Sequence, residues 1–229
     1  MKTDNNNNPY FDSSSQTKLS LAILPYDDFT GQITTRKLAV STKGTRNEAV
    51  LNSTGYYLFL DFENDINGGD ENHLTIAVDS EYFIPFEKLI NLKEMIENDI
   101  NFQRNPVVEV RLKPNAAYPF PPGTTLIRGV VFDSDSKEPV PEAQVQLDDR
   151  NLVATTDENG EFLFYFSELK ASDIIQKQVP DQGSKKFIRM GTNHMFKLIV
   201  KSEKYEDFQD FYSAEVGKIT SLKISLEKR

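Results

Sequence analysis

The side chains that most often carry acid–base or metal chemistry are scarce in this sequence. It contains two histidines, His73 and His194, and no cysteine, which excludes thiol chemistry, disulfides and cysteine-based metal centres. A Ser-His-Asp arrangement is arithmetically possible, but no G-x-S-x-G segment that would present a nucleophilic serine occurs. No H-E-x-x-H pair occurs either, so a zinc site would need both histidines from distant segments. Each histidine opens an apolar run, so we expect structural histidines, no catalytic residue and no enzyme.

One acidic segment has a spacing that resembles half of a calcium loop. Asp65, Asn67 and Asp70 place oxygen ligands around two glycines. The last position of a twelve-residue calcium loop would be Ile76, which is not acidic, so a solvated hairpin turn is favoured. Asp157 and Asn159 have the same two interpretations, with the turn favoured more strongly. We therefore predict no metal and no cofactor, and keep calcium binding as an alternative.

Aromatic residues are the better candidates for a binding surface. Tyr118 and Phe120 lie in a proline-rich stretch, where extended backbone orders at low entropic cost and aromatic rings can anchor a partner. The alternative is that these rings pack within the chain. Tyr205, Phe208 and Phe211 form an acidic–aromatic run, which predicts an edge strand with its rings on the core, or a binding patch. The acidic residues of that run would discourage unwanted edge pairing.

Composition limits the class of protein. The chain has 229 residues, a formal net charge of -9 and 38% hydrophobic residues, which fits one large or two small globular domains. The acidic balance argues against nucleic-acid binding, because phosphate neutralisation needs a basic face. No run of about 18 apolar residues occurs, so no membrane span is expected. Residues 1–16 are Asn/Ser-rich and lack the apolar stretch of a secretory signal, which predicts a disordered tail and a cytoplasmic protein, or one that leaves the cell within a released particle.

Two parts of the chain contain similar segments in the same order. The matched segments are Asn52–Gly55 with Asp157–Gly160, His73–Tyr82 with His194–Tyr205, and Val107–Leu112 with Ile219–Leu226. Four matches in one order, counting the strand-like runs that begin each half, indicate tandem domains at 17–113 and 124–229. Residues 114–123 hold four of the chain's 11 prolines and are expected to form an extended linker.

The hydropathy pattern predicts an all-β fold. Apolar residues alternate with a period of two in Val107–Leu112 and Ile219–Leu226, as expected for antiparallel sheets stacked as a sandwich. Residues 86–103 instead have apolar side chains at spacings of three and four, which predicts a helical insertion. Ser167–Met190 is charged and weakly patterned, and is expected to be a long loop with a helical turn near Leu169–Ile175.

The stretch from Gly129 to Phe166 resembles the carboxypeptidase regulatory-like domain, a transthyretin-like β-sandwich. The matching residues are Gly129, Val131 and Asp133, then Pro139, Val140, Ala143 and Val145, then Thr156, Gly160 and Phe162. The resemblance implies two tandem transthyretin-like sandwiches and a non-catalytic companion domain. The first half is a degenerate match without the Pro-Val-x-x-Ala element.

A weaker resemblance concerns Gly55–Asp61 and Tyr118–Leu126, which look like segments of small proteins encoded with contractile, phage-tail-like injection systems. It implies a structural or accessory particle component. We therefore predict a non-enzymatic structural or interaction module that docks on other proteins of a larger assembly, with a homo-oligomer as an open option. The alternative is a β-sandwich that binds a small ligand, a carbohydrate or calcium.

Overall fold

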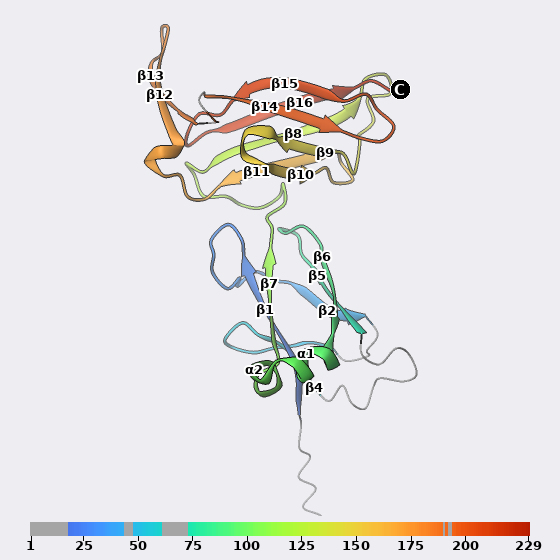
Figure 1. The fold of residues 1–229 in the computed structure, drawn as a ribbon. Coiled ribbons are helices and arrows are strands. Elements are labelled where there is room, and N and C mark those ends of the chain that lie inside the picture. The colour runs from blue at the N-terminus through green and yellow to red at the C-terminus, as the bar shows by residue number, and fades with distance from the viewer. Residues whose placement is uncertain (1–17, 44–47, 61–72, 190, 192–193) are drawn as a thin grey trace, which may run out of the picture. The chain divides into compact units, whose positions relative to one another are not determined.

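The computed structural model describes residues 18–43, 48–60, 73–189, 191 and 194–229, and confirms the all-β fold (Figure 1). The chain divides into two compact units. The first unit comprises residues 1–25, 39–78 and 87–110, and the second comprises residues 26–38, 79–86 and 111–229. Strands β1 (Leu19–Asp27), β5 (His73–Asp79), β6 (Phe86–Asn91) and β7 (Val107–Leu112) therefore each have residues in both units.

The first unit contains two sheets. One has the order β3-β4-β1-β7 and the other β2-β5-β6. The strands are β1 (Leu19–Asp27), β2 (Ala39–Lys43), β3 (Val50–Leu51), β4 (Tyr57–Leu60), β5 (His73–Asp79), β6 (Phe86–Asn91) and β7 (Val107–Leu112). Alternate side chains of β4 and β7 are buried, as are five consecutive residues of β1, so these strands contribute a core. Fully or almost fully buried members include Leu21, Ile23, Phe59, Ile76 and Val110.

The helical insertion is shorter than the spacing predicts. Helix α1 (Leu92–Asn98) and helix α2 (Ile100–Arg104) account for its second part, whereas its first part is strand β6. Asn91 begins α1 by accepting a hydrogen bond from the Glu94 backbone N–H at 3.1 Å. Pairing of β6 with β5 buries Ile90, so tertiary contacts override the helical spacing before Asn91.

The second unit is built around a β-sandwich. Its four-stranded sheet, which we call the β15 sheet, has the order β10-β9-β14-β15, and the facing sheet has the order β11-β8-β16. The strands are β8 (Thr125–Asp133), β9 (Gln144–Leu147), β10 (Leu152–Thr155), β11 (Glu161–Phe166), β14 (Met195–Lys201), β15 (Phe208–Ser213) and β16 (Ile219–Leu226). Strand β16 runs parallel to β8, and β11 runs antiparallel to it.

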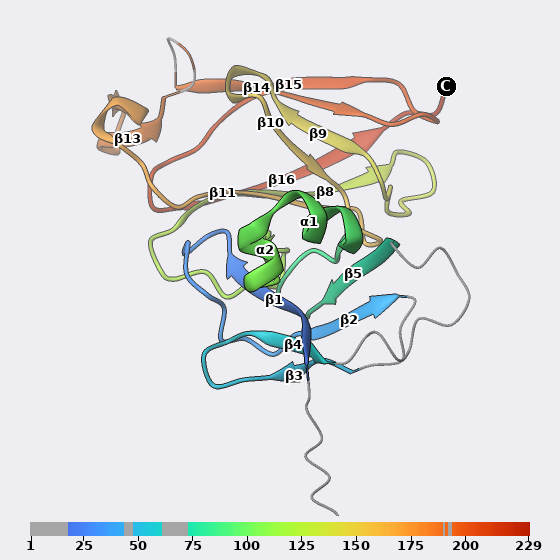
Figure 2. The same ribbon diagram turned by 60° about the horizontal axis from the view of Figure 1, so that its bottom comes forward.

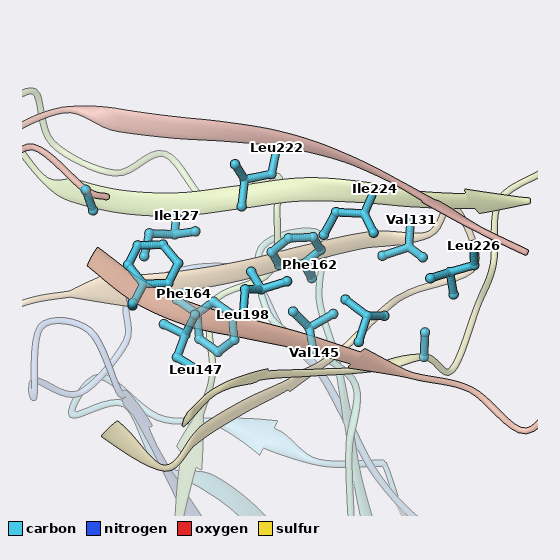
Figure 3. Close-up of a cluster of buried hydrophobic side chains, with 14 of the residues drawn as sticks. Ile127, Val131, Val145, Leu147, Phe162, Phe164, Leu198, Leu222, Ile224 and Leu226 are labelled. Carbon is cyan, nitrogen blue, oxygen red and sulfur yellow. The ribbon is translucent and has the colours of Figure 1, made fainter. Parts of the chain in front are cut away.

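Figure 3 shows the core of this sandwich, with the labelled side chains gathered between the two layers. Phe162 and Phe164 reach it from β11, and Leu198 from β14. Gly129 leaves room for this packing. A Cβ there would lie 2.5 Å from the Leu222 carbonyl oxygen and 2.8 Å from the Phe162 ring, so only glycine fits.

The prediction of a long loop over Ser167–Met190 is wrong. Its centre is a hairpin of β12 (Ile174–Val179) and β13 (Gly183–Ile188), preceded by a 3₁₀ turn at Ala171–Asp173 within the range expected for a helical turn. The hairpin projects from one end of the sandwich in both views (Figures 1 and 2). Among its strand residues Ile188 alone is buried, so the alternation that reveals a half-buried strand is weak.

The strand order repeats along the chain. The order β4-β1-β7 corresponds to β11-β8-β16, and β2-β5-β6 corresponds to β9-β14-β15. We call β1–β7 the first repeat and β8–β16 the second repeat. The turns also match: Asn52 Oδ1 accepts the Thr54 and Tyr56 N–H groups, as Asp157 Oδ1 accepts those of Asn159 and Glu161. The repeats differ at their edges, because β3 joins β4 whereas β10 joins β9.

Candidate protein-interaction site

Strand β8 ends at Asp133, a carboxylate that is only 2% exposed. Its Oδ1 accepts the backbone N–H groups of Asp135 and Ser136, both at 2.9 Å. Its Oδ2 accepts the Tyr205 hydroxyl at 3.1 Å and lies 2.8 Å from the Lys228 ammonium. The predicted interaction residue Tyr205 therefore serves, through its hydroxyl, to tie the turn after β8 to the loop after β14.

These contacts set the charge state of the group. The Lys228 ammonium, followed by the Ser136 N–H, lowers the pKa of Asp133 far below its ordinary value. Asp133 in turn raises the pKa of Lys228, whereas burial is the main cause of the raised pKa of Tyr205. Asp133 and Lys228 are consequently charged at neutral pH, which suits a structural ion pair rather than proton transfer.

The turn after β1 repeats this arrangement at Asp27, which is 4% exposed. Asp27 Oδ1 accepts the backbone N–H groups of Phe29 at 2.9 Å and Thr30 at 3.2 Å. The Gly31 N–H donates to the Asp27 carbonyl at 2.8 Å, as the Lys137 N–H donates to that of Asp133 at 3.1 Å. The Oδ2 partner differs, because it is the Tyr118 hydroxyl.

Tyr118 is thus the second predicted interaction residue whose hydroxyl holds an aspartate turn. It is 6% exposed, and burial followed by the Asp27 hydrogen bond raises its pKa. The Arg36 guanidinium lies 4.7 Å from the Tyr118 ring centroid and 5.0 Å from that of Tyr82, a cation–π arrangement. The sequence pattern did not single out Asp27 or Arg36, because each lies far from Tyr118 along the chain.

Phe120 belongs to the same aromatic cluster, all of it in the second unit. Its ring centroid lies 4.6 Å from Tyr118, 5.0 Å from Phe29 and 5.8 Å from Tyr165. The Tyr165 hydroxyl donates to Asp28 Oδ2 at 2.6 Å, and burial is the main cause of its raised pKa. The structure brings Tyr118 and Phe120 together and engages both rings within the chain, which is the packing arrangement weighed from the sequence.

The remaining two predicted residues lie on the edge strand β15. Phe208 pairs with Val200 and is partly buried against the core. Phe211 pairs with Lys197 on the opposite side of the sheet and is 58% exposed. Phe211 is therefore the predicted interaction residue that the structure places on an open surface.

Phe211 does not stand alone on the outward side of the β15 sheet. Val153 is 56% exposed and Met195 43% exposed, and the strand register places both on the same side as Phe211. Sequence reasoning missed these two, although Val153 lies in a short run without polar alternation. We call Val153, Met195, Lys197, Ile199 and Phe211 the β15 face.

The other chemistry-bearing residues do not converge. His73 begins β5 in the first unit, and His194 precedes β14 in the second. Burial lowers the pKa of His194, whose ring lies 5.4 Å from that of Phe187. Among the described residues, no group of three His, Cys, Asp or Glu side chains could hold a metal ion. Asp65, Asn67 and Asp70 lie outside the described residues.

Asp157 and Asn159, the other calcium alternative, form a turn in which Asp157 Oδ1 caps backbone N–H groups. The described α-helices have 7 and 5 residues, and neither has the length and hydropathy of a membrane span.

No protein-family model and no curated protein matches the chain. Similar solved structures include the Bacillus anthracis TIE protein, at 9% identity over 91% of this chain and 33% of that chain, with a TM-score of 0.29. BcpA, the major pilin subunit of Bacillus cereus, has 12% identity over 84% of this chain and 55% of that one, with a TM-score of 0.29. A Streptococcal ancillary pilin has 8% identity over 93% of this chain and 69% of that chain, with a TM-score of 0.26. The chain spans about a third of the TIE protein and about half of BcpA.

Proposed function

We propose that this chain is a non-enzymatic structural or interaction module that docks on other proteins of a larger assembly through the β15 face. The observation that carries the proposal is Phe211, a large aromatic side chain that is 58% exposed on an edge strand. Exposed aromatic anchors with apolar neighbours are typical of protein interfaces.

The chemistry of the β15 face fits a protein partner. Lys197 lies directly beside Phe211, and Gln146 lies between Ile199 and Val153 in the strand register. Apolar centres flanked by polar side chains match the composition of protein interfaces. The outer edge of β15 also offers backbone groups to which an extended partner segment can add as a further strand.

Two finer statements belong to the same proposal. The second repeat would be a carboxypeptidase regulatory-like domain, which is supported by the fixed roles of its matching residues. Thr156, for example, donates to the Val140 carbonyl at 2.7 Å and accepts the Ala143 N–H at 2.8 Å. The assembly would be a contractile injection particle formed in the cytoplasm, for which the support is the resemblance of Gly55–Asp61 and Tyr118–Leu126.

Isolation of tagged protein from its native host tests the proposal. The Phe211→Gln variant should lose co-isolating proteins at least about tenfold, because a buried aromatic anchor contributes about 2 kcal/mol or more to an interface. Ile219→Gln is the matched control, since Ile219 is 51% exposed on β16 in the other sheet. Equal recovery of partners with both variants would overturn the proposal.

A further inference from the structure

The β12–β13 hairpin is fixed at its base although it projects from the sandwich (Figures 1 and 2). Ile188 is fully buried, and its N–H donates to the Ala214 carbonyl at 2.9 Å. The Val216 N–H donates to the Lys186 carbonyl at 2.8 Å, and the Arg189 N–H to the Asp173 carbonyl at 2.7 Å. A partner that binds this hairpin therefore meets an element that is already ordered.

The hairpin is basic within a chain whose net charge is -9. Residues 174–189 contain Lys177, Lys185, Lys186 and Arg189 against one acidic residue, Asp181. Lys177 pairs directly with Lys185 across the two strands, and like charges in that position destabilise a hairpin. The hairpin therefore keeps its net positive charge at some cost to its own stability.

Only part of this charge is neutralised within the chain. The Lys185 ammonium lies 3.1 Å from Glu215 Oε2. Lys177 and Lys186 take part in no ion pair with the described part of the chain. A surface with an opposite charge would stabilise both ammonium groups.

The opposite end of the same sandwich has that charge. The turn after β8 and the turn before β11 meet there, since the Val131 N–H donates to the Gly160 carbonyl at 2.9 Å. The exposed carboxylates on these turns and the adjoining chain are Asp135, Glu138, Glu142, Asp157 and Glu158, and they outnumber the exposed Lys137 on the same turns. The hairpin instead follows the other end of β11, where Phe166 pairs with Thr125, the first residue of β8. The nine residues of β8 separate the two ends by about 30 Å.

We propose that the β12–β13 hairpin of one molecule docks on the acidic turns of another molecule of this same chain. The inference rests on the proposed structural function and names one partner within the assembly. Because the two surfaces are different and lie at opposite ends, the contact is heterologous and joins molecules head to tail into a ring or an open chain. Attraction between opposite charges makes the association sensitive to salt.

Sedimentation velocity of the full chain tests this association. The average mass should rise with protein concentration at about 10 mM salt and return to that of the monomer at about 1 M salt, where the Debye length falls to about 3 Å. Lys177→Glu/Lys186→Glu should weaken self-association at least about tenfold, and Asp135→Lys/Glu138→Lys/Glu158→Lys, which keeps the turn-capping Asp157, should do the same. Lys88→Glu/Lys223→Glu, with the same change of charge on exposed residues of β6 and β16, should associate as the parent chain does.

Mixing the two charge-reversed variants gives the decisive result. Each variant alone has two ends of the same sign, whereas an equimolar mixture again has opposite ends and should re-form alternating head-to-tail chains. A parent chain that stays monomeric at low salt, a hairpin variant that associates normally, or a mixture that stays monomeric overturns the inference. None of these outcomes changes the Phe211→Gln test, so the two proposals can fail separately.

Discussion

The turn after β1 and the turn after β8 have the same backbone and different side-chain partners. Both place an aspartate at the end of a strand, and both use Oδ1 to accept two backbone N–H groups. The second repeat satisfies Oδ2 with its own Tyr205 and Lys228. The first repeat satisfies it with Tyr118, which lies 91 residues from Asp27.

The reason for the difference lies in the residues at equivalent positions. Isolated bridges join Tyr205 to Lys228 in the second repeat and Phe83 to Pro114 in the first. Neither Phe83 nor Pro114 has a side-chain donor, so a buried carboxylate at Asp27 needs a donor from elsewhere. The proline-rich segment therefore completes the first turn through Tyr118 as well as joining the repeats. The bridges make Phe83 the counterpart of Tyr205, so the match of His73–Tyr82 with His194–Tyr205 is off by one residue at its end.

The largest effect is expected in the strand that precedes each turn. Gly129 pairs with Phe162, and its counterpart Ile23 pairs with Tyr57. Gly129→Ala should lower the free energy of unfolding by about 3 kcal/mol, because its Cβ would overlap the Leu222 carbonyl oxygen. Urea unfolding measures this, with Val130→Ile as the control on the outward side. A cost below that of the control would show that β16 can shift freely.

Removal of the Tyr118 hydroxyl, the donor to Asp27 Oδ2, tests whether the two turns are equivalent. Tyr118→Phe should cost about 2 kcal/mol of unfolding free energy, since Asp27 Oδ2 loses its buried donor. Adding Phe83→Tyr should recover part of that loss by restoring a hydroxyl at the position of Tyr205. If Phe83→Tyr destabilises Tyr118→Phe further, the two turns are not equivalent.

The ion pair at Asp133 predicts a pH dependence that an Asn variant lacks. The folded state lowers the pKa of Asp133, so its contribution is fully present above the unfolded value near pH 4 and is lost as pH falls below it. Asp133→Asn should be less stable than the parent at pH 7, and the difference should shrink below pH 4. Urea midpoints across pH 2–7 measure this, and a constant difference would contradict it.

The smallest effect is expected at Arg36. Arg36→Ala should cost about 1 kcal/mol by removing the cation–π contacts with Tyr82 and Tyr118. Arg36→Lys keeps the charge and should recover about half of the loss. Thermal denaturation checks both variants. If Arg36→Ala is as stable as the parent, the guanidinium does not contact the Tyr82 and Tyr118 rings in solution.

Local patterns predicted much of the fold. Alternation in Ile219–Leu226 places Leu222, Ile224 and Leu226 in the core as expected, and the Asn52 and Asp157 turns match as the repeat predicts. The β12–β13 hairpin was missed because few of its side chains are buried, so its hydropathy pattern has little periodicity.

The candidate site depended on contacts between distant residues. The sequence singled out Tyr118, but its partner Asp27 follows from strand pairing that no local spacing encodes. Phe208 and Phe211 lie in one run and face opposite sides of the sheet, because their positions differ by an odd number. Which of the two is exposed is decided by the register with β14, where Phe211 lies beside Lys197 and Phe208 beside Val200.

Cross-linking mass spectrometry of the native assembly with an amine-reactive reagent tests the docking claim most directly. Lys197 lies beside Phe211 on the β15 face, and Lys223 lies on β16 in the other sheet. The account predicts cross-links from Lys197 to other proteins and few from Lys223. Cross-links to other proteins from Lys223 but none from Lys197 would contradict it.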